Sequence, residues 1–287
     1  MSAIFKKEMR AYFNSMTGYI FIGVFVFVTA LYFSLYNIIS LSPDFRIVLT
    51  SVIMVLLLII PILTMGLLSQ EAKQKTDQLL LTSPVNVYDI VIGKFLASVS
   101  LFLIALLVTF IFPIIISFFG NVVFSEVICA YLGFLFMGIC FISVGIWISS
   151  LSDNQIISAV LTFMAMFVLF FIEGIATSLP EGNLYGIGLA IILCILVGLF
   201  VYYSIEDIKY SLISFVFVAI IFGIVYFVKP EFYNTFLYDF IMSFSMISRF
   251  SNFILGIFDI SSIIFYVSFS AFFIYLTVRS IEKKRWN

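Results

Sequence analysis

Histidine is absent from this 287-residue chain, and charged residues make up only 10% of it. Without an imidazole the chain lacks the commonest general base and transition-metal ligand, and Ser-His or Cys-His catalysis is excluded. The three cysteines, Cys129, Cys140 and Cys194, all lie inside apolar runs. Cysteines in such surroundings pack as small apolar side chains. We therefore expect no disulfide framework, no redox or metal site, and no cofactor.

A nucleotide-binding loop is also missing. The one Gly-Lys pair, Gly93-Lys94, has Tyr88 where a P-loop needs its first glycine and Phe95 where it needs Ser or Thr. Charges are nearly absent from the centres of the apolar runs, where an ion-coupled carrier would carry them. Basic residues cluster only at the termini and in one polar stretch, so no nucleic-acid surface is predicted. The chain is predicted to be no enzyme, and energy for any uphill transport must come from another polypeptide.

Apolar residues, in contrast, make up 64% of the chain. A helix needs about 20 apolar residues to cross about 30 Å of hydrocarbon. The sequence therefore predicts an all-α, polytopic membrane bundle of about eight transmembrane helices, in which Pro61 and Pro113 kink their helices. The eight runs cover roughly 18–39, 47–69, 88–119, 122–150, 155–179, 184–204, 208–228 and 257–280. A six-span alternative, in which 184–228 is re-entrant or does not cross, stays open.

The first 17 residues have a different pattern from the runs that follow. Apolar residues recur on one side of a predicted helix and basic residues occupy the other, as in helices that lie in the headgroup plane. The apolar side carries Phe5, Met9, Tyr12, Phe13 and Met16, and the opposite side carries Lys6, Lys7, Arg10 and Asn14. We predict an amphipathic interfacial helix over 1–17, followed by a membrane domain over 18–287.

Positive charge is unevenly shared between the two sides of the predicted bundle. With the N-terminus inside and eight alternating spans, all but three of the 14 Lys and Arg residues fall on one side. The three exceptions are Arg46, Lys229 and Arg249. Because cytoplasmic loops are enriched in Lys and Arg, both termini are predicted to be cytoplasmic. The aromatic segment 229–256 then lies outside, where amphipathic or re-entrant helices fit its mixed composition.

The longest polar interruption, residues 70–94, falls on the same predicted cytoplasmic side. Opposite charges four residues apart, Glu71 with Lys75 and Lys73 with Asp77, favour a short exposed helix within 70–83. Leu79 to Leu81 offer it an apolar end. Ser83 before Pro84 is typical of a helix N-cap followed by its first residue. Two interpretations stay open: an ordinary charged loop, and an element that a partner ATPase moves.

Four segments resemble a known family, in the same order along nearly the whole chain. They are KKEMRAYFNSMTGYIF, PILTMGLLSQEAKQKTDQLLLTSPVNVYDIVIGKFLA, GIWISSLSDNQIISAVLTF and RFSNFILGIFDISSIIFYVSFSAFFIYLTVRSIEKKRW. They are similar to permease subunits of type-2 ATP-binding-cassette (ABC) exporters, most of all the gliding-motility-associated bacterial kind. The resemblance implies a six-span core, to which 184–228 adds a pair.

The resemblance also implies partners and site residues. Residues 1–17 become an elbow helix with Phe5, Lys6, Lys7, Arg10, Tyr12 and Phe13 at the membrane interface. The coupling helix contacts a separate P-loop ATPase through Glu71, Lys73, Lys75, Thr76, Asp77, Leu79 and Leu80. A second permease half, identical or different, completes the path, and some relatives add an extracytoplasmic subunit. The function implied is ATP-driven export across the bacterial cell membrane; a sensory subunit without net transport is the alternative.

Overall fold

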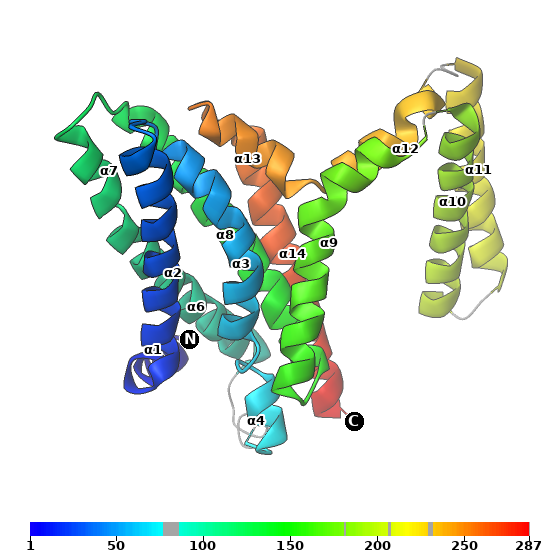
Figure 1. Cartoon of the computed structure of the whole chain (residues 1–287). Coiled ribbons are helices and arrows are strands. Elements are labelled where there is room, and N and C mark those ends of the chain that lie inside the picture. The colour runs from blue at the N-terminus through cyan, green and yellow to red at the C-terminus, as the bar shows by residue number, and fades with distance from the viewer. Residues whose placement is uncertain (77–85, 181, 206–207, 229–231, 287) are drawn as a thin grey trace. The chain divides into compact units, whose positions relative to one another are not determined.

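The computed structural model describes residues 1–76, 86–180, 182–205, 208–228 and 232–286. All of the regular secondary structure in these ranges is helical, which confirms the predicted all-α fold (Figure 1). The elements are α1 (Ser2–Asn14), α2 (Met16–Phe33), the π-helix η1 (Ser34–Ile39), α3 (Arg46–Thr64), α4 (Ser69–Lys73), α6 (Val87–Thr109), α7 (Ile111–Ser117), α8 (Phe124–Leu151), α9 (Gln155–Ser178), α10 (Asn183–Ile205), α11 (Ile208–Val228), α12 (Phe232–Met242), α13 (Met246–Ile254) and α14 (Ile260–Trp286).

Six helical segments within the described ranges are long and apolar enough to cross a membrane. They are Met16–Ile39, Arg46–Lys73, Val87–Ser117, Phe124–Leu151, Gln155–Ser178 and Ile260–Lys284. They match six of the eight predicted runs to within a few residues, so the chain is a multi-pass membrane protein. The other two runs form α10 and α11, whose described apolar parts, Asn183–Leu199 and Ile208–Gly223, are shorter. That these two cross the membrane stays a prediction.

The predicted proline effects differ between the two sites. Pro61 lies inside α3, which continues to Thr64. The run around Pro113 is interrupted: α6 ends at Thr109, and α7 begins at Ile111. A proline ring clashes with the carbonyl four residues earlier, which here belongs to Thr109. The interruption of this run therefore falls where Pro113 requires it.

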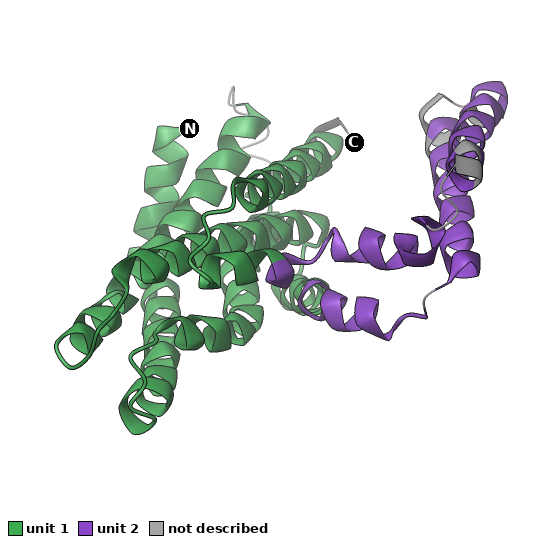
Figure 2. Ribbon diagram, turned by 90° about the horizontal axis from the view of Figure 1, so that it is seen from above, with its two compact units in different colours: residues 1–168, 249–287 green, residues 169–248 purple. Residues whose placement is uncertain are grey.

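The chain divides into two compact units, shown in different colours in Figure 2. The first comprises residues 1–168 and 249–287, and the second comprises 169–248. In the first unit, α8 packs against α3, α6 and α14, while α1 packs against α2 and α6. Most residues of α8 between Val127 and Ser150 are buried. This unit contains α1, α4 and α6.

Gly138 is a point of close approach between α8 and α6. A β-carbon there would lie 2.2 Å from Cε1 of Phe102, a ring that is fully buried. We expect Gly138→Ala to lower the free energy of unfolding by about 1–3 kcal/mol, because overpacking forces neighbours from their rotamers. Thermal unfolding in detergent micelles measures this. Gly23→Ala is the matched control, since a β-carbon at Gly23 meets nothing within 4 Å. Equal melting temperatures for the two variants would contradict the prediction.

In the second unit, α10 packs against α11 and α12. Gly186 of α10 lies against the backbone of Tyr233, whose carbonyl oxygen would be 2.1 Å from a β-carbon at that position. The Tyr233 hydroxyl donates to the carbonyl of Phe222 in α11 at 2.7 Å. The described part of the predicted outer segment 229–256 contains two short helices, α12 and α13. Their position relative to the membrane stays a prediction.

One end of the first unit collects both chain termini and α4 (Figure 1). Val87 and Val91 of α6 form a small core with Val278 and Ile281 of α14, and Leu68 packs on it just before α4. This grouping agrees with the prediction that the termini and the polar stretch share one side. That this side is the cytoplasmic one stays a prediction.

Candidate functional site

Helix α1 has two different sides, as predicted, and its apolar side packs on α6. Ile4 covers Gly93, where a β-carbon would be 3.0 Å from Cγ2 of Ile4. Tyr12 is buried, and Phe5, Met9 and Phe13 are half-buried, whereas Lys6, Lys7, Arg10 and Asn14 are exposed. Placing Met16 on the apolar side is wrong: Ser15 is extended, so Met16 starts α2 and is 79% exposed. The contact of α1 with the membrane interface stays a prediction.

A lysine and two glutamates meet where α1, α4 and α6 converge. Nζ of Lys94 lies 3.0 Å from Oε1 of Glu8 and 2.9 Å from Oε1 of Glu71. The Lys94 side chain is 2% exposed, and those of Glu8 and Glu71 are 11% and 15% exposed. We call these three residues the inner charge cluster. A buried charge is stable only when an opposite charge pairs with it. Lys94 of α6 is therefore the counter-charge for Glu8 of α1 and for Glu71 of α4.

A second amine balances the inner charge cluster. Nζ of Lys7, on the exposed side of α1, lies 3.2 Å from Oε1 of Glu71 and 3.8 Å from Oε1 of Glu8. Two carboxylates thus face two ammonium groups, and the group is formally neutral. Neutrality lowers the cost of taking these charges out of water.

Hydrogen bonds around Lys94 hold α1 on α6. Ser98 donates to the carbonyl of Lys94 at 3.1 Å, and its hydroxyl pairs with that of Tyr12 at 3.0 Å. Burial raises the pKa of Tyr12 well above its usual range, despite the bond to Ser98, so the phenol stays protonated. The α1–α6 contact therefore keeps its polar groups satisfied in a largely buried place.

The described part of the polar stretch differs from its prediction. Helix α4 ends at Lys73, and Lys75 has a left-handed backbone with φ of 56°, so the predicted Glu71–Lys75 pair does not form. Glu71 turns instead towards Lys94 and Lys7. Lys73, Lys75 and Thr76 are exposed at the surface, with the Thr76 amide donating to the carbonyl of Glu71 at 3.0 Å.

The rest of the predicted stretch can be located only in part. Asp77, Leu79, Leu80, Ser83 and Pro84 lie outside the described residues. The predicted start of the next helix at Pro84 is wrong, because Asn86 is not helical and α6 begins at Val87.

Sequence reasoning missed Glu8 and Lys94 as functional residues. The usable signal was a single charge inside an apolar pattern. Glu8 lies three residues after Phe5 and four before Tyr12, on the apolar side of α1. Lys94 lies four residues before Ser98, in the apolar part of α6 that follows Asp89. A charge in such a position requires a counter-charge from another helix.

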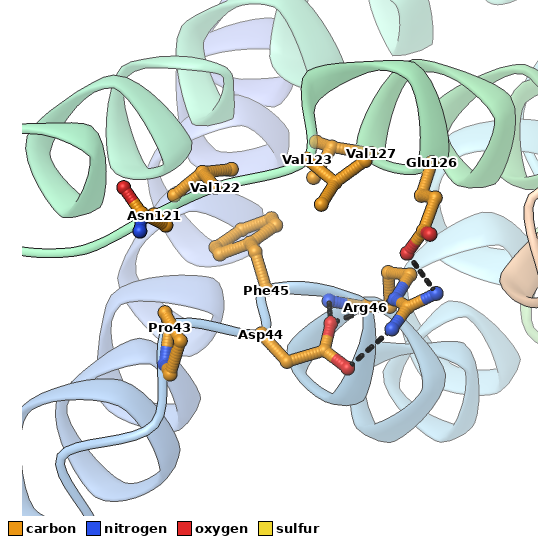
Figure 3. Close-up of a pocket in the computed structure, with 9 residues that line it drawn as sticks. All are labelled: Pro43, Asp44, Phe45, Arg46, Asn121, Val122, Val123, Glu126 and Val127. Atoms are coloured by element: carbon orange, nitrogen blue, oxygen red, sulfur yellow. Dashed lines mark hydrogen bonds and ion pairs between the residues drawn. The ribbon is translucent and has the colours of Figure 1, made fainter.

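A second ionic group lies at the other end of α3 (Figure 3). Arg46 bonds Asp44 through Nε at 2.8 Å and Nη2 at 2.9 Å, and it also pairs with Glu126. Its Nη1 donates to the carbonyl of Ile254 at 3.0 Å. These contacts join the start of α3 to the start of α8 and the end of α13, beside a cavity of about 150 Å³. We call Asp44, Arg46 and Glu126 the outer charge cluster.

Acid is expected to weaken the outer charge cluster. Burial acts to raise the pKa of Asp44, but the hydrogen bonds and charge of Arg46 outweigh it, so that pKa lies below its usual range. Because the pKa of Asp44 is lower in the folded than in the unfolded chain, the Asp44 carboxylate stabilises the fold above its unfolded pKa of about 3.9. This stabilisation is lost as the pH falls below about 3.9. Thermal unfolding between about pH 6 and about pH 3 should therefore show a shallower decline for Asp44→Asn than for the natural chain. Parallel declines would contradict this.

The inner charge cluster is a set of salt bridges that join helices. The described residues contain no group of three or more His, Cys, Asp or Glu that could hold a metal ion. Cys129, Cys140 and Cys194 are free and buried. The cluster instead connects a short surface element, α4, to α1 and to the first part of a long apolar helix, α6.

Comparison with known proteins places this sequence in a family. The model of ABC-2 family transporter proteins matches residues 4–206, more than half of the chain. The match includes most of α1, all of α4 and all three residues of the inner charge cluster. Neither the comparison with curated proteins nor that with solved structures gave a match. Members of the family are typically the non-catalytic membrane components of ABC systems and associate with an ABC ATPase. The chain belongs to the ABC-2 family of transporter membrane proteins.

Proposed function

We propose that this chain is the permease subunit of an ATP-driven ABC exporter in a bacterial cytoplasmic membrane, with both termini in the cytoplasm. The observation that carries the proposal is the inner charge cluster, since it ties α4 to α1 and α6 through Lys94. The family match supports an ABC permease. The motifs quoted above support a place among the gliding-motility-associated permeases.

In this mechanism the segment that begins with α4 receives the motion of a separate P-loop ATPase. Lys73, Lys75 and Thr76 are exposed and free to contact that partner, together with Asp77, Leu79 and Leu80 as further contacts. Glu71 has a different part, because it points into the inner charge cluster. A push on α4 therefore moves α1 and α6 with it, since separating them would leave buried charges unpaired.

The complex proposed here contains two permease halves, identical or different, and two ATPases. ATP binding closes the ATPase dimer, moves α4 in each half and reopens the path between the halves outward. An extracytoplasmic accessory subunit fits the outer segment 229–256 as a further partner. The pair α10 and α11 is an addition to the six-helix core of the family.

Charge reversal of the exposed lysines tests the proposed contact. Lys73→Glu with Lys75→Glu should abolish co-purification of the cognate ATPase and its ATP turnover with the permease. The reason is that two positive charges proposed to attract the ATPase surface would become negative charges that repel it. Lys283→Glu is the matched control, an exposed lysine on α14 at the same end of the unit. Unchanged binding and turnover in the double variant would refute the role of this segment. Stimulated ATP turnover without flux into vesicles would indicate the alternative, a sensory subunit.

A further inference from the structure

A groove of about 420 Å³ lies between α1 and α2 on one side and α3 on the other. This volume is within the range of ligand-binding pockets, about 300–1,000 Å³. Its lining changes along its length. Ile20, Val24, Ile59 and Ile62 line one part, while Gln70 and Gln155 lie at the end towards α4 and α9. The groove has the two-part lining that suits an amphipathic molecule.

Two primary amides are the available polar groups of the groove. Gln70 Oε1 and Gln155 Nε2 both face Gly66, at 3.3 and 3.7 Å from the place of a β-carbon there. Neither amide group has a hydrogen-bond partner among the residues that the structure describes. The amides offer both donors and acceptors to an occupant.

The other polar groups in the lining are already engaged. Ser15 pairs with Thr17 at 2.6 Å, Tyr12 with Ser98 at 3.0 Å, and Glu8 with Lys94 at 3.0 Å. The negative charge of Glu8 is balanced within the inner charge cluster. The polar end of the groove thus suits a neutral head group that donates and accepts hydrogen bonds, and it gives no net charge to an ionic one.

The apolar part of the groove opens on the outer face of the bundle. Ile20, Val24 and Ile62 are 54%, 43% and 57% exposed, whereas Ile59 and Phe21 at the floor are 5% exposed. On a membrane-spanning helix pair, exposed apolar side chains of this kind face hydrocarbon. An alkyl chain can therefore lie along α2 and α3 and bury apolar surface at the groove floor.

We propose that this groove binds a single-chain amphiphile whose neutral head group carries hydroxyl or amide groups. The head group bonds the amides of Gln70 and Gln155, and the chain lies against Ile20, Ile59 and Ile62. A resident membrane lipid and an exported molecule of this chemistry would bind alike. Binding needs only the folded chain, so the proposal can be tested without the ATPase. Its outcome is therefore independent of whether the chain exports a substrate.

Photolabelling of the full-length chain in lipid nanodiscs tests the proposal. The probe is a monoacylglycerol with a diazirine in its chain, and mass spectrometry maps the labelled residues. Label is expected on α2 and α3. Gln70→Leu with Gln155→Leu should reduce it about tenfold, the effect of losing two neutral hydrogen bonds. Gln74→Leu, an exposed glutamine at the end of α4, is the matched control and should leave labelling unchanged.

Two further arms make the result decisive. Ile20→Trp, which fills the groove from its exposed rim without touching the amides, should also remove the label. Equal labelling of the natural chain and both groove variants, or label confined to other helices, would overturn the proposal. Loss of label when the cognate ATPase and ATP are added would identify a transported occupant, and its retention would identify a resident lipid.

Discussion

Replacement of Lys94 by methionine is expected to lower the free energy of unfolding by about 3–5 kcal/mol, the cost of breaking a buried ion pair by removing one partner. Glu8 and Glu71 would be left mostly buried, with their Oε1 atoms around the same vacated position. Lys7 would remain near both glutamates, but its side chain is 60% exposed. Because water screens its charge, Lys7 would replace little of the attraction lost with Lys94. Chemical unfolding in detergent micelles measures the loss, with the exposed Lys283→Met as control.

A triple variant separates the stability of the inner charge cluster from its proposed role. Lys94→Met with Glu8→Gln and Glu71→Gln removes the three charges together. No unpaired buried carboxylate is then left, so much of the stability lost in Lys94→Met should return. ATP-driven transport should not return, because α4 would no longer be tied to α1 and α6 by charge. A single Lys94→Met variant as stable as the natural chain, or a triple variant with full transport, would refute this role.

Replacement of Arg46 by methionine is expected to lower the free energy of unfolding by about 2 kcal/mol. The change leaves Asp44 and Glu126 to repel each other and removes a donor from the carbonyl of Ile254. The loss is smaller than at Lys94 because the three side chains are 24–35% exposed and water screens their charges. Thermal unfolding near neutral pH measures it.

The repulsion left by Arg46→Met can be relieved separately. Adding Asp44→Asn should restore part of the lost stability, since only Glu126 then remains charged. Arg10→Met, at an exposed arginine of α1, is the control for removal of one positive charge. If Arg46→Met melts like this control, the outer charge cluster does not hold α3, α8 and α13 together.

Local patterns in the sequence predicted the helices well. The run 155–179 is α9, Gln155–Ser178, and the run 122–150 is α8, Phe124–Leu151. The two sides of α1 also followed from spacing alone. These features depend on apolar length and on a period of 3.6 residues, both of which are local properties of the chain. The family resemblance was likewise carried by contiguous motifs, and the match over residues 4–206 confirmed it at the level of the ABC-2 family.

The partners of individual charges could not be predicted in this way. The local rule paired Glu71 with Lys75, as an exposed pair four residues apart, which contributes only about 0.3–0.5 kcal/mol. Burial of Lys94 outweighs that preference, since an unpaired buried charge costs several kcal/mol. Lys94 meets Glu8 across 86 positions, and Arg46 meets Ile254 across 208. The spacing of these residues in the sequence does not predict such contacts.

The sequence by itself determined that this chain is an all-helical, multi-pass membrane protein without its own nucleotide-binding loop. Apolar length and missing residue types are sufficient for those conclusions. Only the tertiary structure decided that Glu71 pairs with Lys94, that Glu8 joins them, and that Gln70 and Gln155 both line one groove. The reason is that burial and charge pairing depend on which helices touch, and that is set by packing of the whole unit.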